Sequence, residues 1–137
     1  MNLFLKTGEG QKNLDCVSSI VQLGDFFYLS GQLGEGQTFR DQAISACYAI
    51  SDVLAQFNLR FDHVLKFTVY LSDIDFYDEF LSVFENFVDQ PYPAMTIVES
   101  PHLPENAMIC IDGCGVNTLR HERSMHDAYC EDCDEKM

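Results

Sequence analysis

The fold of this chain depends on the stretch "HVLKFTVYL", residues 63–71. Its side chains alternate with the period of two that a β-strand imposes. One row contains Leu65, Phe67, Val69 and Leu71, and the other contains Val64, Lys66, Thr68 and Tyr70. Both rows are largely apolar, as in strands that are buried on two faces. We therefore predict a strand that other layers cover on both faces.

Turn and helix signals precede this strand. Residues 16–22 and 26–31 flank Leu-Gly-Asp, which favours a tight β-hairpin. Thr38 and Asp41 have the spacing of a capping box, with Asp in place of the usual Glu. Apolar side chains then recur at helical spacing, at Ile44, Cys47, Ile50, Leu54 and Phe57. The sequence before residue 63 thus predicts two strands followed by a helix over residues 38–57.

A second helix and two further strands follow the strand predicted over residues 63–71. Asp75 is the predicted cap of this helix. Its apolar stripe contains Phe76, Phe80, Phe84 and Phe87. Pro91 and Pro93 end it, because the residue before a proline disfavours helical geometry. We predict the last two strands over residues 95–100 and 108–117.

The order β-β-α-β-α-β-β predicts an α+β sandwich with two helices packed on one face of the sheet. Apolar groups on the second face would need a partner. We assign residues 1–118 to this domain. Residues 119–137 are polar and acidic, and they form a tail or an appended helix.

The charge balance disfavours several classes of function. The chain has 22 acidic and 8 basic residues, a formal charge of −14, and no Lys or Arg from Phe67 through Leu119. A phosphate backbone or an anionic membrane surface attracts clustered cations. We therefore expect no nucleic-acid and no membrane partner. The chain start lacks signal-peptide features and no apolar run reaches about 18 residues, so we expect a cytoplasmic protein with reduced thiols.

Three quoted stretches carry a resemblance to a known family: "LGDFFYLSGQLG", "DHVLKFTVYLSDIDFYDEF" and "YPAMTIVESPHLPENAMICIDGCG". Together they resemble the Rid proteins, the reactive-intermediate imine deaminases that are also called YjgF-like or L-PSP endoribonuclease-type proteins. The resemblance spans about residues 14–117. It implies a fold like that of the trimeric chorismate mutases, with three subunits around a central barrel and a ligand cleft at each subunit interface.

The same resemblance indicates that the family's catalytic groups are absent. Active members read Pro-Ala-Arg where this chain reads Pro93-Ala94-Met95. That arginine donates two parallel hydrogen bonds to the carboxylate of a 2-imino acid, whereas a methionine side chain carries no charge. Cys110 stands where active members hold the glutamate that orients water. A cleft tyrosine and an asparagine of the second helix are replaced by Val17 and Leu81.

The ligand-binding positions that the resemblance implies are Val17, Ser30, Gly31, Leu81, Met95 and Cys110. We expect Met95 and Cys110 to be neighbours across the cleft, where they either simply pack or form a soft, apolar pocket. We expect no catalytic residue, metal or cofactor.

Cys110 would need a nearby base or cation to act as a nucleophile, and His102 is the candidate in the preceding turn. Three cations, Arg40, Arg60 and Lys66, are interpreted as solvated charges or ion pairs rather than as replacements for the arginine.

Three functions remain open. The first is a catalytically silent homotrimer that binds a small metabolite or a protein partner at its interface clefts. The second is an imine or enamine deaminase with a rearranged site, which uses Asp112 on the face of Cys110 or a residue of a neighbouring subunit. The third, a ribonuclease, is disfavoured by the acidic charge.

The acidic tail contains His121, His126, Cys130 and Cys133. Their number suits zinc, but the spacing is not that of a standard finger. A zinc site, a redox-active Cys-x-x-Cys and an inert tail all remain open, and we favour the inert tail.

Overall fold

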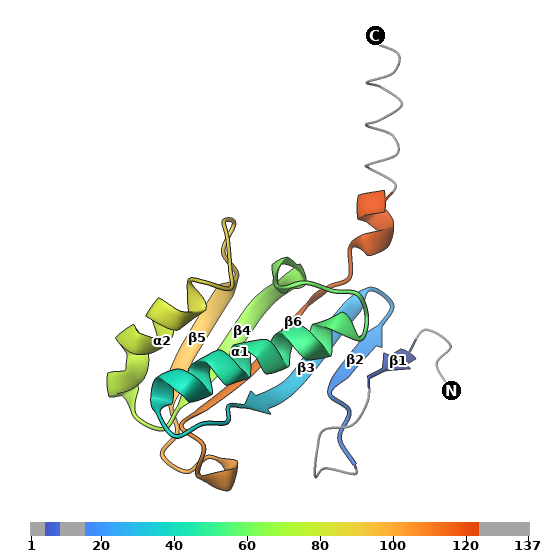
Figure 1. Ribbon diagram of the computed structural model, residues 1–137. Helices are drawn as coiled ribbons and strands as arrows, with labels where there is room; N and C mark the ends of the chain where they lie inside the picture. Colours follow the sequence, from blue (N-terminus) through green and yellow to red (C-terminus); the bar gives the residue numbers. More distant parts are fainter. Residues whose placement is uncertain (1–4, 9–15, 124–137) are drawn as a thin grey trace.

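The computed structural model describes residues 5–8 and 16–123, which form one β-sheet with two main helices on one of its faces (Figure 1). The strands are β1 Leu5–Thr7, β2 Ile20–Leu23, β3 Phe26–Leu33, β4 Val64–Leu71, β5 Ala94–Glu99 and β6 Ile109–Val116. The helices are α1 Phe39–Ala55 and α2 Tyr77–Phe84. The predicted α+β architecture is confirmed. The short strand β1 at one sheet edge was not predicted.

The six strands follow the order β1-β2-β3-β6-β4-β5. β4 lies between β6, to which it is antiparallel, and β5, to which it is parallel. The hairpin of β2 and β3 turns at Gly24, whose φ of 62° suits the first central position of a two-residue loop. No helix among the described residues is both long and apolar enough to span a bilayer.

A side-chain cap begins α1 but not α2. The Thr38 hydroxyl accepts a hydrogen bond from the Asp41 amide at 3.1 Å, so the predicted cap of α1 is confirmed. The predicted cap of the second helix, Asp75, is wrong, because α2 begins after Phe76 without a side-chain cap. Asp73 caps the turn before α2, and its carboxylate accepts a hydrogen bond from the Asp75 amide at 2.8 Å. The difference arises because a short 3₁₀ turn, Ile74–Phe76, precedes α2.

The hydrophobic core fills the space between the helices and the sheet. Its fully buried large side chains include Phe27, Phe67, Phe80, Ile50, Leu54 and Ile111. The rings of Phe67 in β4 and Phe84 in α2 meet edge to face, with centroids 5.3 Å apart. Aromatic packing therefore joins β4 directly to the second helix.

The two rows predicted for β4 are wrong at its first residues. The register with β6 slips between Val64 and Lys66, so two steps along β4 oppose one step along β6. This β-bulge puts Val64 into the core with Phe67 and leaves Leu65 59% exposed on the other face. Gly115 of β6 lies under the bulge, where an added Cβ would collide with the carbonyl oxygen of His63.

The second sheet face is open in the single chain. It carries exposed aromatic side chains, Phe26 and Tyr28, together with the exposed Leu65 and Val98. Monomeric proteins rarely expose contiguous apolar patches of this kind without a partner. That three subunits cover this face stays a prediction.

The beginning of the acidic tail contacts the domain. Residues 119–123 are helical, and Leu119 packs against the core. The Glu122 carboxylate accepts hydrogen bonds from Arg60 at 2.8 Å and from Thr118 at 2.9 Å, and its contact with His63 Nε2 is also 2.9 Å. The Arg60 amide donates to His63 Nδ1, so Nε2 carries the hydrogen that bonds Glu122. His121 is exposed, whereas His126, Cys130 and Cys133 lie outside the described residues.

We predict that Glu122→Gln destabilises the protein at pH 7 and that this loss shrinks in acid. Hydrogen bonds from His63, Arg60 and Thr118 lower the pKa of Glu122 from 4.5 to about 2. A depressed carboxylate pKa contributes stability above the unfolded value and loses it as the pH falls through the folded value. The difference in unfolding free energy should therefore fall between pH 4.5 and pH 2.

Urea unfolding of both proteins at pH 7, 5, 4 and 3 measures this difference. Because the carboxylate is exposed, we expect less than about 1 kcal/mol at pH 7. Glu35→Gln, which removes an exposed carboxylate without an ion pair among the described residues, should change little at any of these pH values. A Glu122→Gln effect that is constant with pH would contradict the prediction.

Candidate functional site

Three of the six predicted cleft positions, Ser30, Gly31 and Cys110, lie in the paired strands β3 and β6. The register of these strands slips between Leu29 and Gln32. Gly31 faces Cys110 so closely that a Cβ built on it would lie 2.7 Å from the cysteine sulfur. The Ser30 hydroxyl donates a hydrogen bond to the carbonyl oxygen of Ser18 at 2.6 Å, next in the chain to Val17. The structure thus brings Gly31 and Cys110 together, with Ser30 and the chain at Val17 alongside.

Asp112 lies two residues from Cys110 on the same face of β6, as the alternation predicted. Tyr70 and Thr68 of β4 pair with Cys110 and Asp112, respectively, and both hydroxyls donate hydrogen bonds to the Asp112 carboxylate. Burial raises the pKa of Asp112, although these hydrogen bonds and the charge of Lys66 oppose the shift. The negative charge of Asp112 is also the main cause that raises the pKa of Tyr70. The open face therefore carries a polar cluster in which Tyr70 remains a donor.

The Cys110 thiol is not activated. Burial, together with the negative charge of Asp112, raises its pKa from 9.0 to about 11. Nucleophilic cysteines have the opposite shift, produced by a cation or an imidazole. His102, the base considered from the sequence, is exposed, and no hydrogen bond joins it to Cys110 among the described residues. At neutral pH the sulfur is present as a protonated thiol.

Within one chain, Met95 and Cys110 lie on opposite faces of the sheet, so their expected contact across a cleft between subunits stays a prediction. Met95 of β5 pairs with Phe67, which points into the core, and its side chain packs against the core. Cys110 pairs with Tyr70, on the opposite face of the sheet. Leu81, on α2, is exposed on the helical side. The six predicted positions therefore form two groups, one on each side of the sheet.

The cations near the sheet already have partners. The Lys66 ammonium donates to the Thr96 hydroxyl at 2.7 Å. Arg60 bonds Asp62 and Glu122, with nitrogen–oxygen distances of 3.1 and 2.8 Å. Arg40 donates to Ser82 at 3.4 Å. None of these three side chains takes the place of a cation at Met95, in agreement with the interpretation from the sequence.

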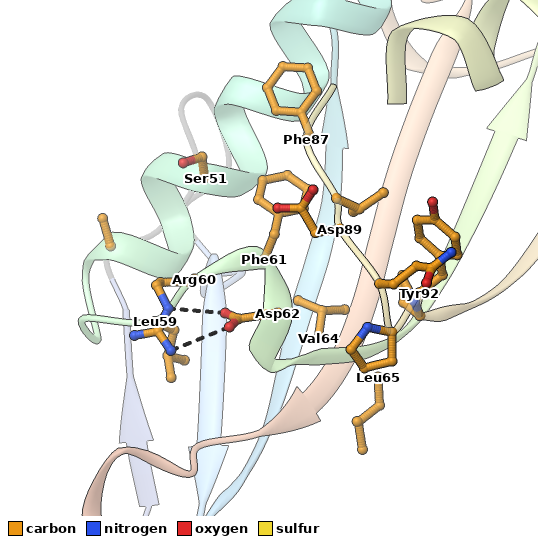
Figure 2. Close-up of a pocket in the computed structure, with 15 residues that line it drawn as sticks. Ser51, Leu59, Arg60, Phe61, Asp62, Val64, Leu65, Phe87, Asp89 and Tyr92 are labelled. Atoms are coloured by element: carbon orange, nitrogen blue, oxygen red, sulfur yellow. Dashed lines mark hydrogen bonds and ion pairs between the residues drawn. The ribbon is translucent and has the colours of Figure 1, made fainter. Parts of the chain in front are cut away.

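A pocket of about 810 Å³ lies elsewhere, at the end of the sheet where β4 begins (Figure 2). Its walls come from the end of α1, from the turn before β4 and from the segment between α2 and β5. It is lined by Ser51, Ala55, Leu59, Arg60, Phe61, Asp62, Val64, Leu65 and residues 87–93. None of the six positions predicted from the sequence lines it. Sequence reasoning missed this pocket because separate chain segments, without a shared motif, form it.

Metal ligation finds no support in the described part of the chain. Within residues 5–8 and 16–123, no group of three or more His, Cys, Asp or Glu side chains is placed to hold a metal ion. Of the four possible ligands in the tail, His126, Cys130 and Cys133 lie outside these residues.

Comparison with known proteins gives the family. The family model described as Endoribonuclease L-PSP matches residues 14–116. A RutC family protein of Saccharolobus solfataricus is 28% identical over 117 residues, which cover 80% of this chain and 93% of that protein. The 2-iminobutanoate/2-iminopropanoate deaminase of Dermatophagoides farinae is 27% identical over 103 residues, with coverages of 69% and 80%.

Solved structures agree with this result. RidA from the Antarctic bacterium Psychrobacter sp. PAMC 21119 is 25% identical, with a TM-score of 0.75 over 82% of this chain and 98% of that protein. Yeast Mmf1 shares the fold, with a TM-score of 0.77, 22% identity and coverages of 82% and 98%. The chain therefore belongs to the endoribonuclease L-PSP family, the Rid or YjgF family that its sequence resembles.

We predict that Cys110 reacts slowly with iodoacetamide at pH 8. Raising a thiol pKa from 9.0 to about 11 lowers the thiolate fraction about a hundredfold, and only the thiolate attacks. The exposed Cys16 should be alkylated much faster in the same sample. Peptide mapping by mass spectrometry separates the two rates.

Asp112→Asn should increase the alkylation rate of Cys110, since it removes the negative charge that contributes to the raised pKa. The rate at Cys16 is the internal control. Alkylation of Cys110 as fast as that of Cys16 in the unmodified protein would show that the thiol is activated after all.

Proposed function

We propose that this protein is a homotrimer that binds a small molecule at clefts between its subunits and does not hydrolyse 2-imino acids. The observation that carries the proposal is the division of the predicted cleft positions between two faces of one sheet. Gly31 and Cys110 lie on the open face, whereas Met95 lies on the helical face of the edge strand β5. Two subunits are needed to bring both groups into one cleft.

The surface of the single chain supports such an assembly. Its open face exposes Phe26, Tyr28 and Val98, whose burial would stabilise a complex at about 25 cal/mol per Å² of apolar surface. β5 is an edge strand, so its outer side has no neighbour in the sheet of one chain. A second subunit placed against β5 would cover both features, and its Cys110 could approach Met95.

The chemistry of the cleft supports ligand binding without imine hydrolysis. Met95 contributes no charge for a carboxylate, and the Cys110 thiol stays protonated at neutral pH. The same positions suit a small neutral or soft ligand, or a side chain of a protein partner. The described cysteines are all free, which suits the cytoplasmic location that we propose. A charge of −14 disfavours a nucleic-acid partner.

A rearranged deaminase site is the second candidate. Asp112 lies on the face of Cys110, and Tyr70 and Thr68 hold its carboxylate in place. Burial shifts its pKa upward, toward the range in which a general base works well. The mite relative is described as a 2-iminobutanoate/2-iminopropanoate deaminase. This candidate requires a substrate whose binding does not depend on an arginine at position 95.

We predict a trimer in solution, with a mass of about 47 kDa for three chains of 15.6 kDa by light scattering at micromolar concentration. Tyr28→Asp, which puts a charge on the open face, should dissociate the trimer. Tyr48→Asp is the matched control, because Tyr48 is 59% exposed on α1 and Tyr28 is 57% exposed on β3. A monomeric unmodified protein would contradict the prediction.

We predict that the unmodified protein does not hydrolyse 2-iminobutanoate or 2-iminopropanoate above background. Losing a buried bidentate contact to a charged substrate costs several kcal/mol, and each ~1.4 kcal/mol is tenfold in rate. Met95→Arg should restore binding of a 2-keto acid more than turnover. Met95→Arg combined with Cys110→Glu should restore part of both.

The assay measures semicarbazone formation from the imine, which competes with imine hydrolysis, in each of these proteins. Thr96→Arg is the control, since Thr96 is the next residue of β5 and its side chain points to the opposite face from that of Met95. It should restore neither binding nor turnover. Strong hydrolysis by the unmodified protein that disappears in Asp112→Asn would replace the first proposal with the second.

A further inference from the structure

The pocket in Figure 2 is separate from the proposed intersubunit cleft. Leu65 lines the pocket at the start of β4, whereas Cys110 pairs with Tyr70 near the end of that strand. Five residues separate Leu65 from Tyr70, which corresponds to about 17 Å along a strand. The pocket has a volume of about 810 Å³, which lies in the range of small-molecule sites.

Aromatic and aliphatic side chains form most of the pocket walls. The rings of Phe61 and Phe87 lie with centroids 5.7 Å apart, and the exposed Tyr92 belongs to the same lining. Leu65 reaches the pocket because the bulge in β4 turns it out of the core. Aromatic faces are negative in their centres and attract cations as well as apolar groups.

The charged groups of the lining are Arg60, Asp62 and Asp89. Arg60 is held between Asp62 at 3.1 Å and Glu122 at 2.8 Å, so two carboxylates already neutralise its charge. Figure 2 shows the two bonds between Arg60 and Asp62. The Asp89 carboxylate has no ion pair or hydrogen bond with another described residue. The pocket thus offers one unpaired negative charge beside three aromatic rings.

We propose that this pocket binds an organic cation with an aromatic body, of the arylalkylammonium class. The aromatic body would pack among Phe61, Phe87 and Tyr92, and the ammonium group would pair with Asp89. The charge of −14 on the chain favours the approach of such a cation and disfavours an anion of the same shape. This inference does not depend on the proposed function of the interface cleft.

The test compares three probes of similar size on the full chain at pH 7.5 and low salt. They are 2-phenylethylammonium, the neutral 2-phenylethanol and the anionic 3-phenylpropanoate. Titrations followed by ¹⁵N–¹H chemical shifts should move the amide signals of residues 59–65 and of residues 87–90 and 92, since Pro91 and Pro93 have no amide hydrogen. We expect the cation to bind at least tenfold more tightly than the anion, with the alcohol between them.

Two matched variants test the role of Asp89. Asp89→Asn should weaken binding of the cation at least fivefold and leave binding of the alcohol unchanged. Glu85→Gln removes an equal charge from an exposed residue outside the lining and should change neither. Equal binding of the cation and the anion, or equal effects of the two variants, would overturn the proposal. Pocket signals that shift with protein concentration alone would also overturn it, because a second copy of the chain would then occupy the pocket.

Discussion

The pairing of β4 with a neighbouring strand on each side is the constraint on which the rest of this structure depends. Hydrogen bonds to β6 on one side and β5 on the other hold this strand, so its side chains can point only to the helices or to the open face. Phe67 points to the helices, is fully buried and packs edge to face on Phe84. This contact helps to hold α2 against the sheet within the crossover that joins β4 to the parallel strand β5.

The same constraint divides the candidate site. Register with β4 assigns Met95 to the face of Phe67 and Cys110 to the face of Tyr70. A sheet is a barrier that side chains of one subunit cannot cross, so a cleft that uses both residues has to be built between subunits. The exposed aromatic groups of the open face would supply the apolar surface for the assembly that we propose.

Charge distinguishes the two ends of the sheet, for which we propose different ligands. At the end of Cys110, burial and Asp112 keep the thiol protonated, and the polar groups of β4 bond Asp112 rather than a substrate anion. At the other end, Arg60 serves to hold the start of the acidic tail through Glu122. The pocket beside it is left with the unpaired carboxylate of Asp89. Arg60 thus serves the structure of the chain itself rather than a ligand.

The sequence by itself determined the elements whose signals are local. The Thr38 cap depends on a hydroxyl that accepts a hydrogen bond from an amide only three residues away. The hairpin turn depends on Gly24. The alternation within β6 likewise placed Asp112 on the face of Cys110. Only the tertiary structure decided the burial of Val64 in place of Leu65, the opposite faces of Met95 and Cys110, and the pocket at Asp89. Each of these depends on the register between strands or on the meeting of distant segments, and the period of two within one strand is the same for either register.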